Sequence, residues 1–409
     1  NETYDRAIFK LKSEKMFDKI FWLILCAFNI QQEQRCRLNS RRDFGEPLPI
    51  IIRNGRLLEP NDGDGNVYMR GGESLTISCE GGGAIEHSNI RNKMTTASVT
   101  CQGDDLFFNE QLINAPSTFH LFGCSIPPPY VSRMTRTSCY NSYMIYEVGY
   151  HVQNSFYPVY ETCFNHDNLS PVFSKYTQKP YNAKFQQRVD RPFFKDDNVY
   201  NGAPVESLYS PYSLRSAVGQ RTGTSEYITQ EHYLSRGHLA AKTDFVFAFG
   251  ERATFHYVNC AAQWYGFNSG NWNTLEVDLR NHVNQEGYNT IIYTGIYDYL
   301  ELGNNSIYLY SDVNNNPVIP VPLYYYKVIY EPSLGLGTAF VGINKPYYSL
   351  EEARALFFCH DVCRNNRDFS WLSWNPERAL DGYAFCCTVD DFRRIVPHLP
   401  HFQVHGLLT

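Results

Sequence analysis

The chain has 409 residues, enough for about two to three domains with substantial hydrophobic cores. Charged residues make up 19% and aromatic residues 15%, a composition that excludes disordered and low-complexity classes. Lysine and arginine total 36 against 42 aspartates and glutamates, so the formal net charge is −6. This charge excludes a polycation that holds nucleic acid by bulk attraction, but it leaves room for local contacts through a few arginines.

The first segment of the chain has the pattern of a targeting signal. Residues 1–15 are polar and precede Met16, and Lys19 is followed by the apolar run Ile20–Phe28. A membrane-spanning helix needs about 20 apolar residues, so this run is typical of the apolar region of a signal peptide. We predict an upstream extension over 1–15 and a signal peptide over 16–32, the alternative being a buried N-terminal helix. No other run approaches membrane-spanning length, so we expect a secreted protein with no stable membrane association.

The cysteines agree with export, because disulfides persist in oxidising compartments. The chain has 12 cysteines, and removal of the signal peptide takes away one of them. Those from Cys79 to Cys387 could form five disulfides, with Cys36 left over. Their pairing cannot be read from spacing.

Four cysteines lie close together near the C-terminus: Cys359, Cys363, Cys386 and Cys387. With His360 they could be drawn as a zinc site. Adjacent cysteines in an exported protein favour two local disulfides instead. The histidines of the last fifty residues are irregularly spaced, so we expect surface histidines and no second metal site at His360, His398, His401 and His405.

Residues 36–135 are punctuated by glycine, asparagine and aspartate. Short alternating or apolar runs occur at 74–79, 97–101 and 106–108. Short strands separated by tight turns are typical of a small β domain. We predict a disulfide-linked, β-rich N-terminal domain over 36–135 with a structural or substrate-positioning role.

Residues 136–409 mix strand patterns with helix patterns, which predicts an α+β domain. The expected strands cover 138–158, 290–294, 324–330 and 338–343, and the expected helices cover 271–286, 350–365 and 389–395. The tyrosine-rich run at 324–330 is interpreted as sheet core in preference to a base-stacking surface.

The densest set of chemically useful residues runs from position 233 to 283. The triplet from Arg236 to His238 comes first, and Asn268, Glu276 and Arg280 follow. Apolar residues repeat with a helical period around Glu276 and Arg280, so these two lie one turn apart on one face. A histidine, an amide, a carboxylate and several arginines suit phosphodiester hydrolysis: the histidine accepts a proton from water, a metal ion neutralises charge, and guanidinium groups hold phosphate oxygens.

These residues resemble the DNA/RNA non-specific endonucleases of the ββα-metal class, and among them the secreted double-stranded ribonucleases of arthropods. The resemblance covers residues 140–400, approximately, and depends on three strings. They are Arg-Gly-His ending at His238, Asn-x-x-x-Gln from Asn259 to Gln263, and Asn-x-Gly-x-Trp-x-x-Leu-Glu-x-x-x-Arg from Asn268 to Arg280. It implies a ββα-metal nuclease domain over 136–409, with a central antiparallel sheet flanked by helices.

The resemblance also implies roles for the site residues. His238 would be the general base, and Asn268 the one direct protein ligand of a hydrated Mg²⁺, for which Mn²⁺ would substitute. Glu276 would hold metal-bound water. Arg236 and Arg280 would contact the scissile phosphate or stabilise its transition state.

A further arginine of the family matches Arg191, with Arg188 as a competing alignment. Two positions depart from the usual pattern: Ser235 replaces an aspartate, and Ala262 replaces a proline. Neither position supplies a catalytic group, so the departures bear on subfamily and loop geometry more than on activity.

The implied activity is secreted, Mg²⁺-dependent, sequence-tolerant cleavage of RNA and DNA, including double-stranded RNA, that leaves 5′-phosphate ends. The digestive lumen is one extracellular location that the resemblance suggests. The alternative is a non-catalytic secreted protein that binds or takes up nucleic acid on a nuclease fold. A cysteine-rich structural protein would explain the cysteines but not the residues from Arg236 to Arg280.

Overall fold

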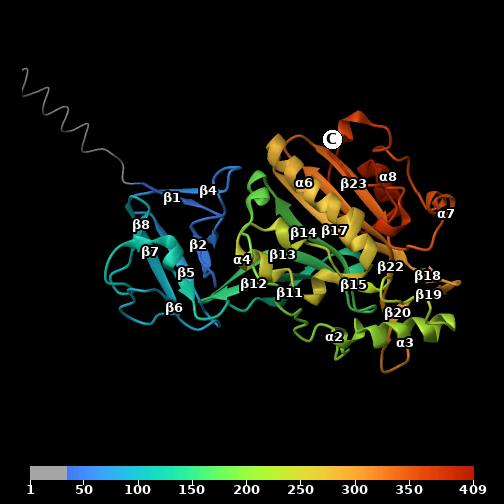
Figure 1. The fold of residues 1–409 in the computed structure, drawn as a ribbon, viewed down its shortest axis with the longest axis horizontal. Coiled ribbons are helices and arrows are strands. Elements are labelled where there is room, and N and C mark those ends of the chain that lie inside the picture. Colours follow the sequence, from blue (N-terminus) through green and yellow to red (C-terminus); the bar gives the residue numbers. More distant parts are fainter. Residues whose placement is uncertain (1–34) are drawn as a thin grey trace, which may run out of the picture.

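A computed structural model describes residues 35–409 as a β-rich N-terminal part joined to a larger α+β part (Figure 1). The predicted upstream extension, 1–15, and signal peptide, 16–32, lie outside the described residues. Within residues 35–409, no helix is both long and apolar enough to span a bilayer.

The N-terminal part consists of short strands, as the frequent turn residues predict. Its central sheet has the order β3-β2-β5-β7-β8-β9, and two-stranded sheets pair β1 with β4 and β6 with β10. The strands are β1 (Arg35–Asn39), β2 (Ile50–Arg53), β3 (Arg56–Leu57), β4 (Asn66–Arg70), β5 (Ser74–Ser78), β6 (Ile85–Glu86), β7 (Thr96–Gly103), β8 (Leu106–Phe108), β9 (Ser117–Thr118) and β10 (Gly123–Cys124). Strands β5, β7 and β8 confirm the three strands predicted here.

Disulfides tie this part together. Cys36 bonds to Cys101 and Cys79 bonds to Cys124. The expectation that Cys36 would be left over is therefore wrong. Strand pairing between β1 and β4, and the packing of β1 against β7, bring Cys36 to a cysteine 65 residues away. The free cysteine of the described residues is the buried Cys260.

The larger part is built on an eight-stranded sheet whose neighbours are all antiparallel. In spatial order the strands are β11 (Val131–Ser138), β12 (Met144–Val152), β13 (Ser155–Asn165), β14 (Ser170–Gln178), β17 (Thr290–Tyr299), β22 (Pro322–Glu331), β23 (Leu336–Ile343) and β24 (Ala384–Cys387). Nearly all of β22 is buried, which confirms that the tyrosine-rich run is sheet core. Strand β11 runs through position 135, where the predicted boundary lies.

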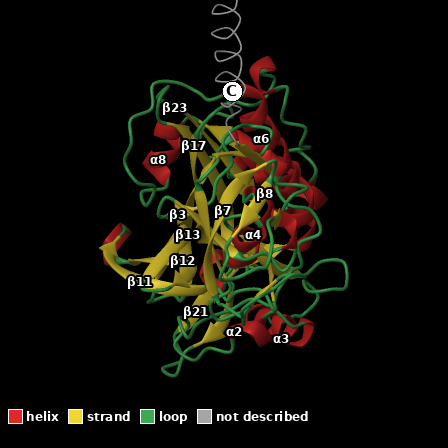
Figure 2. Ribbon diagram, turned by 90° about the vertical axis from the view of Figure 1, so that its left-hand side faces the viewer, coloured by secondary structure: helices red, strands yellow, loops and turns green. Residues whose placement is uncertain are grey.

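Helices cover both faces of this sheet, with α6 and α8 on opposite sides (Figure 2). The helices are α2 (Val205–Leu208), α3 (Pro211–Thr222), α4 (Ala248–Ala253), α5 (Tyr265–Phe267), α6 (Asn273–Glu286), α7 (Leu350–Ala355) and α8 (Val389–Ile395). Short strands complete the part: β15 (Leu234–His238), β16 (Cys260–Trp264), β18 (Glu301–Leu302), β19 (Asn305–Ser306), β20 (Tyr308–Ser311) and β21 (Pro317–Pro320). The α+β class with a central antiparallel sheet is as predicted.

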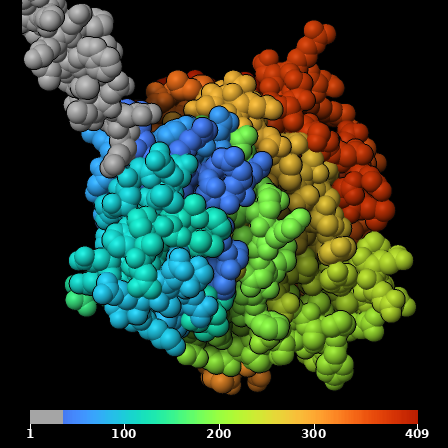
Figure 3. Space-filling view, turned by 60° about the vertical axis from the view of Figure 1, so that its left-hand side comes forward, coloured from blue at the N-terminus to red at the C-terminus, as the bar shows by residue number. Residues whose placement is uncertain are grey.

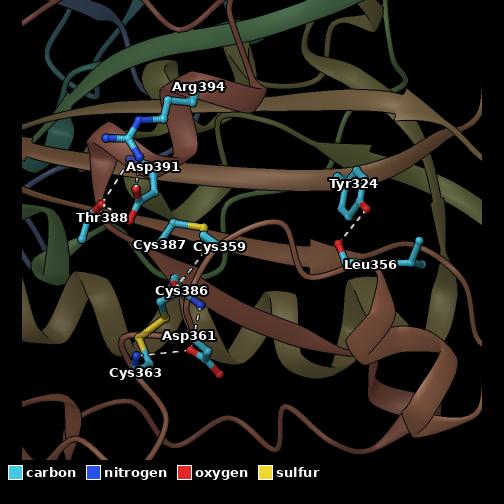
Figure 4. Close-up of a disulfide and its surroundings, with 10 residues drawn as sticks. All are labelled: Tyr324, Leu356, Cys359, Asp361, Cys363, Cys386, Cys387, Thr388, Asp391 and Arg394. Atoms are coloured by element: carbon cyan, nitrogen blue, oxygen red, sulfur yellow. Dashed lines mark hydrogen bonds and ion pairs between the residues drawn. A yellow bond between two sulfur atoms is a disulfide. The ribbon is translucent and has the colours of Figure 1, made fainter.

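The predicted helix over 350–365 is too long, because α7 ends at Ala355. Beyond it the chain is held to β24 by two disulfides, which Figure 4 shows: Cys359–Cys387 and Cys363–Cys386. Asp361, between them, accepts hydrogen bonds from the backbone N–H groups of Cys363 (3.2 Å) and Cys386 (3.0 Å). The hydrogen bonds hold the segment at the sheet edge. The two disulfides leave no free thiolate among these four cysteines, so they exclude a zinc site made of the four.

The C-terminal histidines differ from expectation at one position. His360, His401 and His405 are exposed, as predicted. His398 is instead partly buried, and its Nε2 lies 2.9 Å from the hydroxyl of Tyr326. Burial lowers the pKa of His398 to about 4, so this residue belongs to the core packing.

The N-terminal part packs directly against the larger part (Figure 3). Lys179 forms an ion pair with Glu59 at 2.8 Å, and the rings of Phe44 and Phe247 have centroids 4.8 Å apart. The Ser40 hydroxyl donates to the carbonyl of Lys184 at 2.6 Å. The two parts therefore share one hydrophobic core.

Cys260 is expected to resist alkylation in the folded protein. It is 3% exposed, and burial raises the pKa of its thiol to about 12, so the reactive thiolate is scarce. Iodoacetamide treatment followed by peptide mass spectrometry should label the Cys260 peptide only when guanidinium is present. Labelling of the native protein at a rate close to that of the denatured protein would contradict the buried position.

Candidate active site

The residues from position 234 to 286 form a ββα unit. Strands β15 and β16 pair antiparallel, with His238 opposite Cys260, and the chain continues through α5 into α6. Gly237 is required at the centre of the pair, because a Cβ atom there would lie 2.4 Å from Oε1 of Gln263 and 2.7 Å from the hydroxyl of Tyr325. The close packing of Gln263 and Tyr325 against the strand therefore leaves room only for glycine at the position before His238.

His238 lies among aromatic rings at the end of β15. Its ring centroid is 5.1 Å from that of Phe194 and 4.9 Å from that of Phe255. Burial, together with the smaller effects of the charges of Arg191 and Lys242, lowers the pKa of His238 to about 3. The imidazole is therefore neutral near neutral pH and able to accept a proton.

Asn259 fixes the chain that follows His238. Its side-chain amide donates to the carbonyls of Ala240 (2.9 Å) and Thr254 (3.0 Å). Its Oδ1 accepts from the backbone N–H of Ala240 (2.8 Å) and from the hydroxyl of Ser174 (2.8 Å). Asn259 belongs to the motif on which the resemblance depends, but the sequence assigned it no role.

Asn268 begins a π-helical turn over Asn268–Trp272 that joins α5 to α6. Its Nδ2 donates to the hydroxyl of Ser235 at 3.0 Å, and that hydroxyl donates to the carbonyl of Gln263 at 2.9 Å. These bonds orient the amide, and no donor within residues 35–409 reaches its Oδ1. An amide oxygen is a ligand that Mg²⁺ accepts, and such turns often occur at functional sites. Asn268 is therefore suited to bind Mg²⁺ through its Oδ1.

Glu276 lies on α6, eight positions after Asn268 in the sequence. Burial raises the pKa of the Glu276 carboxyl, and the nearby Lys327 counteracts that shift. Lys327 is 1% exposed and comes from β22. A carboxylate oxygen and an amide oxygen are both hard donors of the kind that suits Mg²⁺.

Arg280 lies inside the protein, one turn after Glu276. Its Nη1 is 2.6 Å from Oδ1 of Asp244, and the exposed fractions of the two side chains are 4% and 1%. Asp244 also lies 3.8 Å from the Nζ of Lys327 and accepts a hydrogen bond from the hydroxyl of Tyr176 at 2.6 Å. Arg280 thus belongs to a buried charge network with Asp244 and Lys327 that supports the ββα unit. It does not form a solvent-exposed ion pair with Glu276.

Sequence reasoning missed Asp244 and Lys327. Asp244 lies in a short 3₁₀ turn, and Lys327 is the one basic residue in a strand of tyrosines and aliphatic residues. The available signal was the lysine itself, since a lysine in a buried strand requires a partner.

Arg236 is held on the same strand as His238. Its Nε donates to the hydroxyl of Tyr257 at 3.0 Å, and its Nη2 donates to the carbonyl of Glu206 at 2.9 Å. The guanidinium carbon lies 5.0 Å from the ring centroid of Tyr209. Partly exposed and fixed in direction, Arg236 presents a positive charge beside the histidine.

Arg191 is exposed and lies close to His238. Its guanidinium carbon is 5.3 Å from the ring centroid of Phe255, the ring that also packs on His238. Of the two competing alignments, Arg191 rather than Arg188 is the arginine whose charge lowers the pKa of His238.

A sequence model described as DNA/RNA non-specific endonuclease matches residues 141–392. A salivary endonuclease of Lutzomyia longipalpis is 26% identical over 361 residues, which are 85% of this chain and 79% of that protein. Salivary protein Tsal2A of Glossina morsitans morsitans is 27% identical, over 91% of this chain and 94% of that protein. A salivary endonuclease of Culex quinquefasciatus is 25% identical, over 92% of this chain and 93% of that protein. A chain in the crystal structure of the EndoG/EndoGI complex is 18% identical, with a TM-score of 0.37 over 61% of this chain and 87% of that chain.

Proposed function

Because this chain belongs to the DNA/RNA non-specific endonuclease family, a family of metal-dependent nucleases, we propose that it is a secreted endonuclease that hydrolyses RNA and DNA at sites of any sequence. Double-stranded RNA is included among its substrates. The observation that carries the proposal is the neutral, partly buried imidazole of His238 beside Arg191 and Arg236.

His238 acts as the general base in this proposal. Its depressed pKa keeps the ring unprotonated, so it accepts a proton from the attacking water without first losing one. The two exposed or partly exposed guanidinium groups, Arg191 and Arg236, hold phosphate oxygens. Arginines that contact only the phosphates position the backbone without reading base edges, which accounts for cleavage at any sequence.

Asn268 would hold a Mg²⁺ through Oδ1, and Glu276 would hold it through water. The metal ion would supply charge neutralisation on the phosphate and on the leaving oxygen. The Ser235 hydroxyl keeps the Asn268 amide in one orientation. The products would carry a 5′-phosphate and a 3′-hydroxyl.

Secretion is supported by five disulfides and by the apolar run after Lys19. Disulfides persist in oxidising compartments outside the cytosol. The names of three similar proteins place them in saliva. An extracellular fluid is therefore the proposed place of action.

Chelation and loss of the amide ligand are both expected to impair metal-dependent cleavage. EDTA should abolish cleavage, and Asn268→Ala should lower the apparent affinity for Mg²⁺ by at least about 100-fold, because even outer-shell partners of a metal cost 10- to 100-fold. The measurement is initial cleavage rate against Mg²⁺ concentration. Asn273→Ala, which removes an exposed asparagine at the start of α6, is the control and should titrate like the wild type. Full activity in EDTA would refute the proposed metal role.

The substrate range is tested by digesting double-stranded RNA, double-stranded DNA and both single strands under one set of conditions, followed by analysis of the product ends. We expect cleavage of all four with 5′-phosphate ends. Tight binding with no cleavage at any divalent-metal concentration would instead support the non-catalytic binding protein.

A further inference from the structure

We propose that Phe193 stacks on a nucleobase next to the scissile phosphate, so that unpaired nucleotides gain a contact that duplex nucleic acid lacks. The inference depends on the proposed function, and it assigns to Phe193 a preference of the enzyme for single-stranded regions. Three observations on Phe193 support it: its exposure, its position and the fixed backbone around it.

Phe193 is 87% exposed, more than any other aromatic side chain in the described part of the chain. A single exposed apolar residue is ordinary on a protein surface. This one, however, belongs to the short segment that builds the site. Arg191 precedes it by two positions, and Phe194 follows it directly.

The neighbouring side chains of Phe193 and Phe194 point in different directions. The ring of Phe194 packs inward, with centroids 5.1 Å from His238 and 5.3 Å from Tyr257. Phe193 points to solvent. The exposed ring therefore lies one residue away from a direct neighbour of the general base.

The backbone on both sides of this ring is fixed. The Tyr130 hydroxyl lies within hydrogen-bonding distance of the carbonyls of Phe193 (3.3 Å) and Phe255 (2.8 Å). The N–H of Lys195 also donates to the carbonyl of Phe255 at 3.0 Å. Pro192 restricts the chain before the ring. Because the backbone is already held here, stacking a base on the ring does not require the backbone to be ordered first.

The ligand chemistry follows from these neighbours. Arg191 offers a positive charge to a phosphate, and an apolar ring two residues along offers a flat face. Together they match the charged backbone and the π-face of one nucleotide strand. Every base has such a face, so stacking tolerates any sequence. In a duplex the bases are covered by each other, and contact with Phe193 would require unstacking a step.

The test compares strands with and without bases. A fluorescent single-stranded DNA and an abasic strand of the same length are titrated with the full chain in Mg²⁺, with binding followed by anisotropy. The His238→Ala background slows cleavage, by about 10²- to 10⁴-fold, so that binding is measured before the strand is cut. The variants added to it are Phe193→Ala, Phe193→Trp and the control Leu334→Ala. Leu334 is 52% exposed in the turn after β22, and that strand extends about 20 Å beyond Tyr325, the residue next to Gly237.

Phe193→Ala is expected to weaken binding of the base-containing strand about tenfold and to leave binding of the abasic strand unchanged. Phe193→Trp should restore binding, and Leu334→Ala should have no effect. In the cleaving enzyme, Phe193→Ala should raise KM for single strands with little change in kcat.

Unchanged affinity of Phe193→Ala for the base-containing strand would overturn the inference. An equal loss on the abasic strand would also overturn it, since the contact would then be to the backbone. If the parent protein neither binds nor cuts any strand, the proposed function fails together with the inference. That result is distinct from a wild-type nuclease that is indifferent to Phe193.

Discussion

Replacing His238 with alanine is expected to lower kcat by about 10²- to 10⁴-fold, the usual contribution of a positioned general base. The imidazole is neutral because burial, Arg191 and Lys242 all lower its pKa, so its loss removes the group that takes the proton from water. Steady-state cleavage of double-stranded RNA measures the effect. Substrate affinity should change little, because Arg191 and Arg236 keep their positions.

His151→Ala is the control for this experiment, because it removes an exposed histidine from β12. It should cut at the wild-type rate. Thermal melting of both variants separates loss of catalysis from loss of fold. A folded His238→Ala protein with wild-type kcat would show that another group accepts the proton.

The second large effect is expected from Asp244→Ala, which should destabilise the fold by about 3–5 kcal/mol. Asp244 is 1% exposed and compensates the buried Arg280 at 2.6 Å and Lys327 at 3.8 Å. Its removal leaves the buried Arg280 without its ion-pair partner and Lys327 with Glu276 as its remaining nearby carboxyl group. Urea denaturation followed by fluorescence gives the free energy of unfolding.

A surface ion pair provides the matched comparison for Asp244. Glu147 pairs with Arg133 at 2.7 Å, but the arginine side chain is 47% exposed. Glu147→Ala should therefore cost about 1 kcal/mol or less. Equal costs for the two substitutions would contradict a buried network beneath the site.

The site was predictable to the extent that it is local in sequence. Strands β15 and β16 and helix α6 follow one another, so the spacing from His238 to Asn268 and Glu276 describes one contiguous unit. Asp244 and Lys327 were not predictable, because Lys327 meets Asp244 only after β22 has joined the sheet. The inward burial of Arg280 was missed for the same reason, since an i,i+4 pattern does not show what lies beneath the helix.

In the rest of the fold, too, local features were predictable from the sequence and long-range contacts were not. Strands with a clear alternating or apolar pattern, such as β5 and β22, were predicted from local sequence. The pairing of Cys36 with Cys101 was not, because it joins residues that only the packing of β1 on β7 brings together. The helix predicted over 350–365 failed because tertiary disulfides overrode local helix propensity after Ala355.

The most direct measurement of the central claim is the single-turnover rate at which wild type and His238→Ala cut one labelled double-stranded RNA, each with Mg²⁺ and with EDTA. Single-turnover conditions separate the chemical step from product release. We predict that the wild type cuts the RNA in Mg²⁺ but not in EDTA. In Mg²⁺, the rate of His238→Ala should be at least about 100-fold lower than that of the wild type. Equal rates for the two proteins, or binding of the RNA by the wild type without any cleavage in Mg²⁺, would contradict the account.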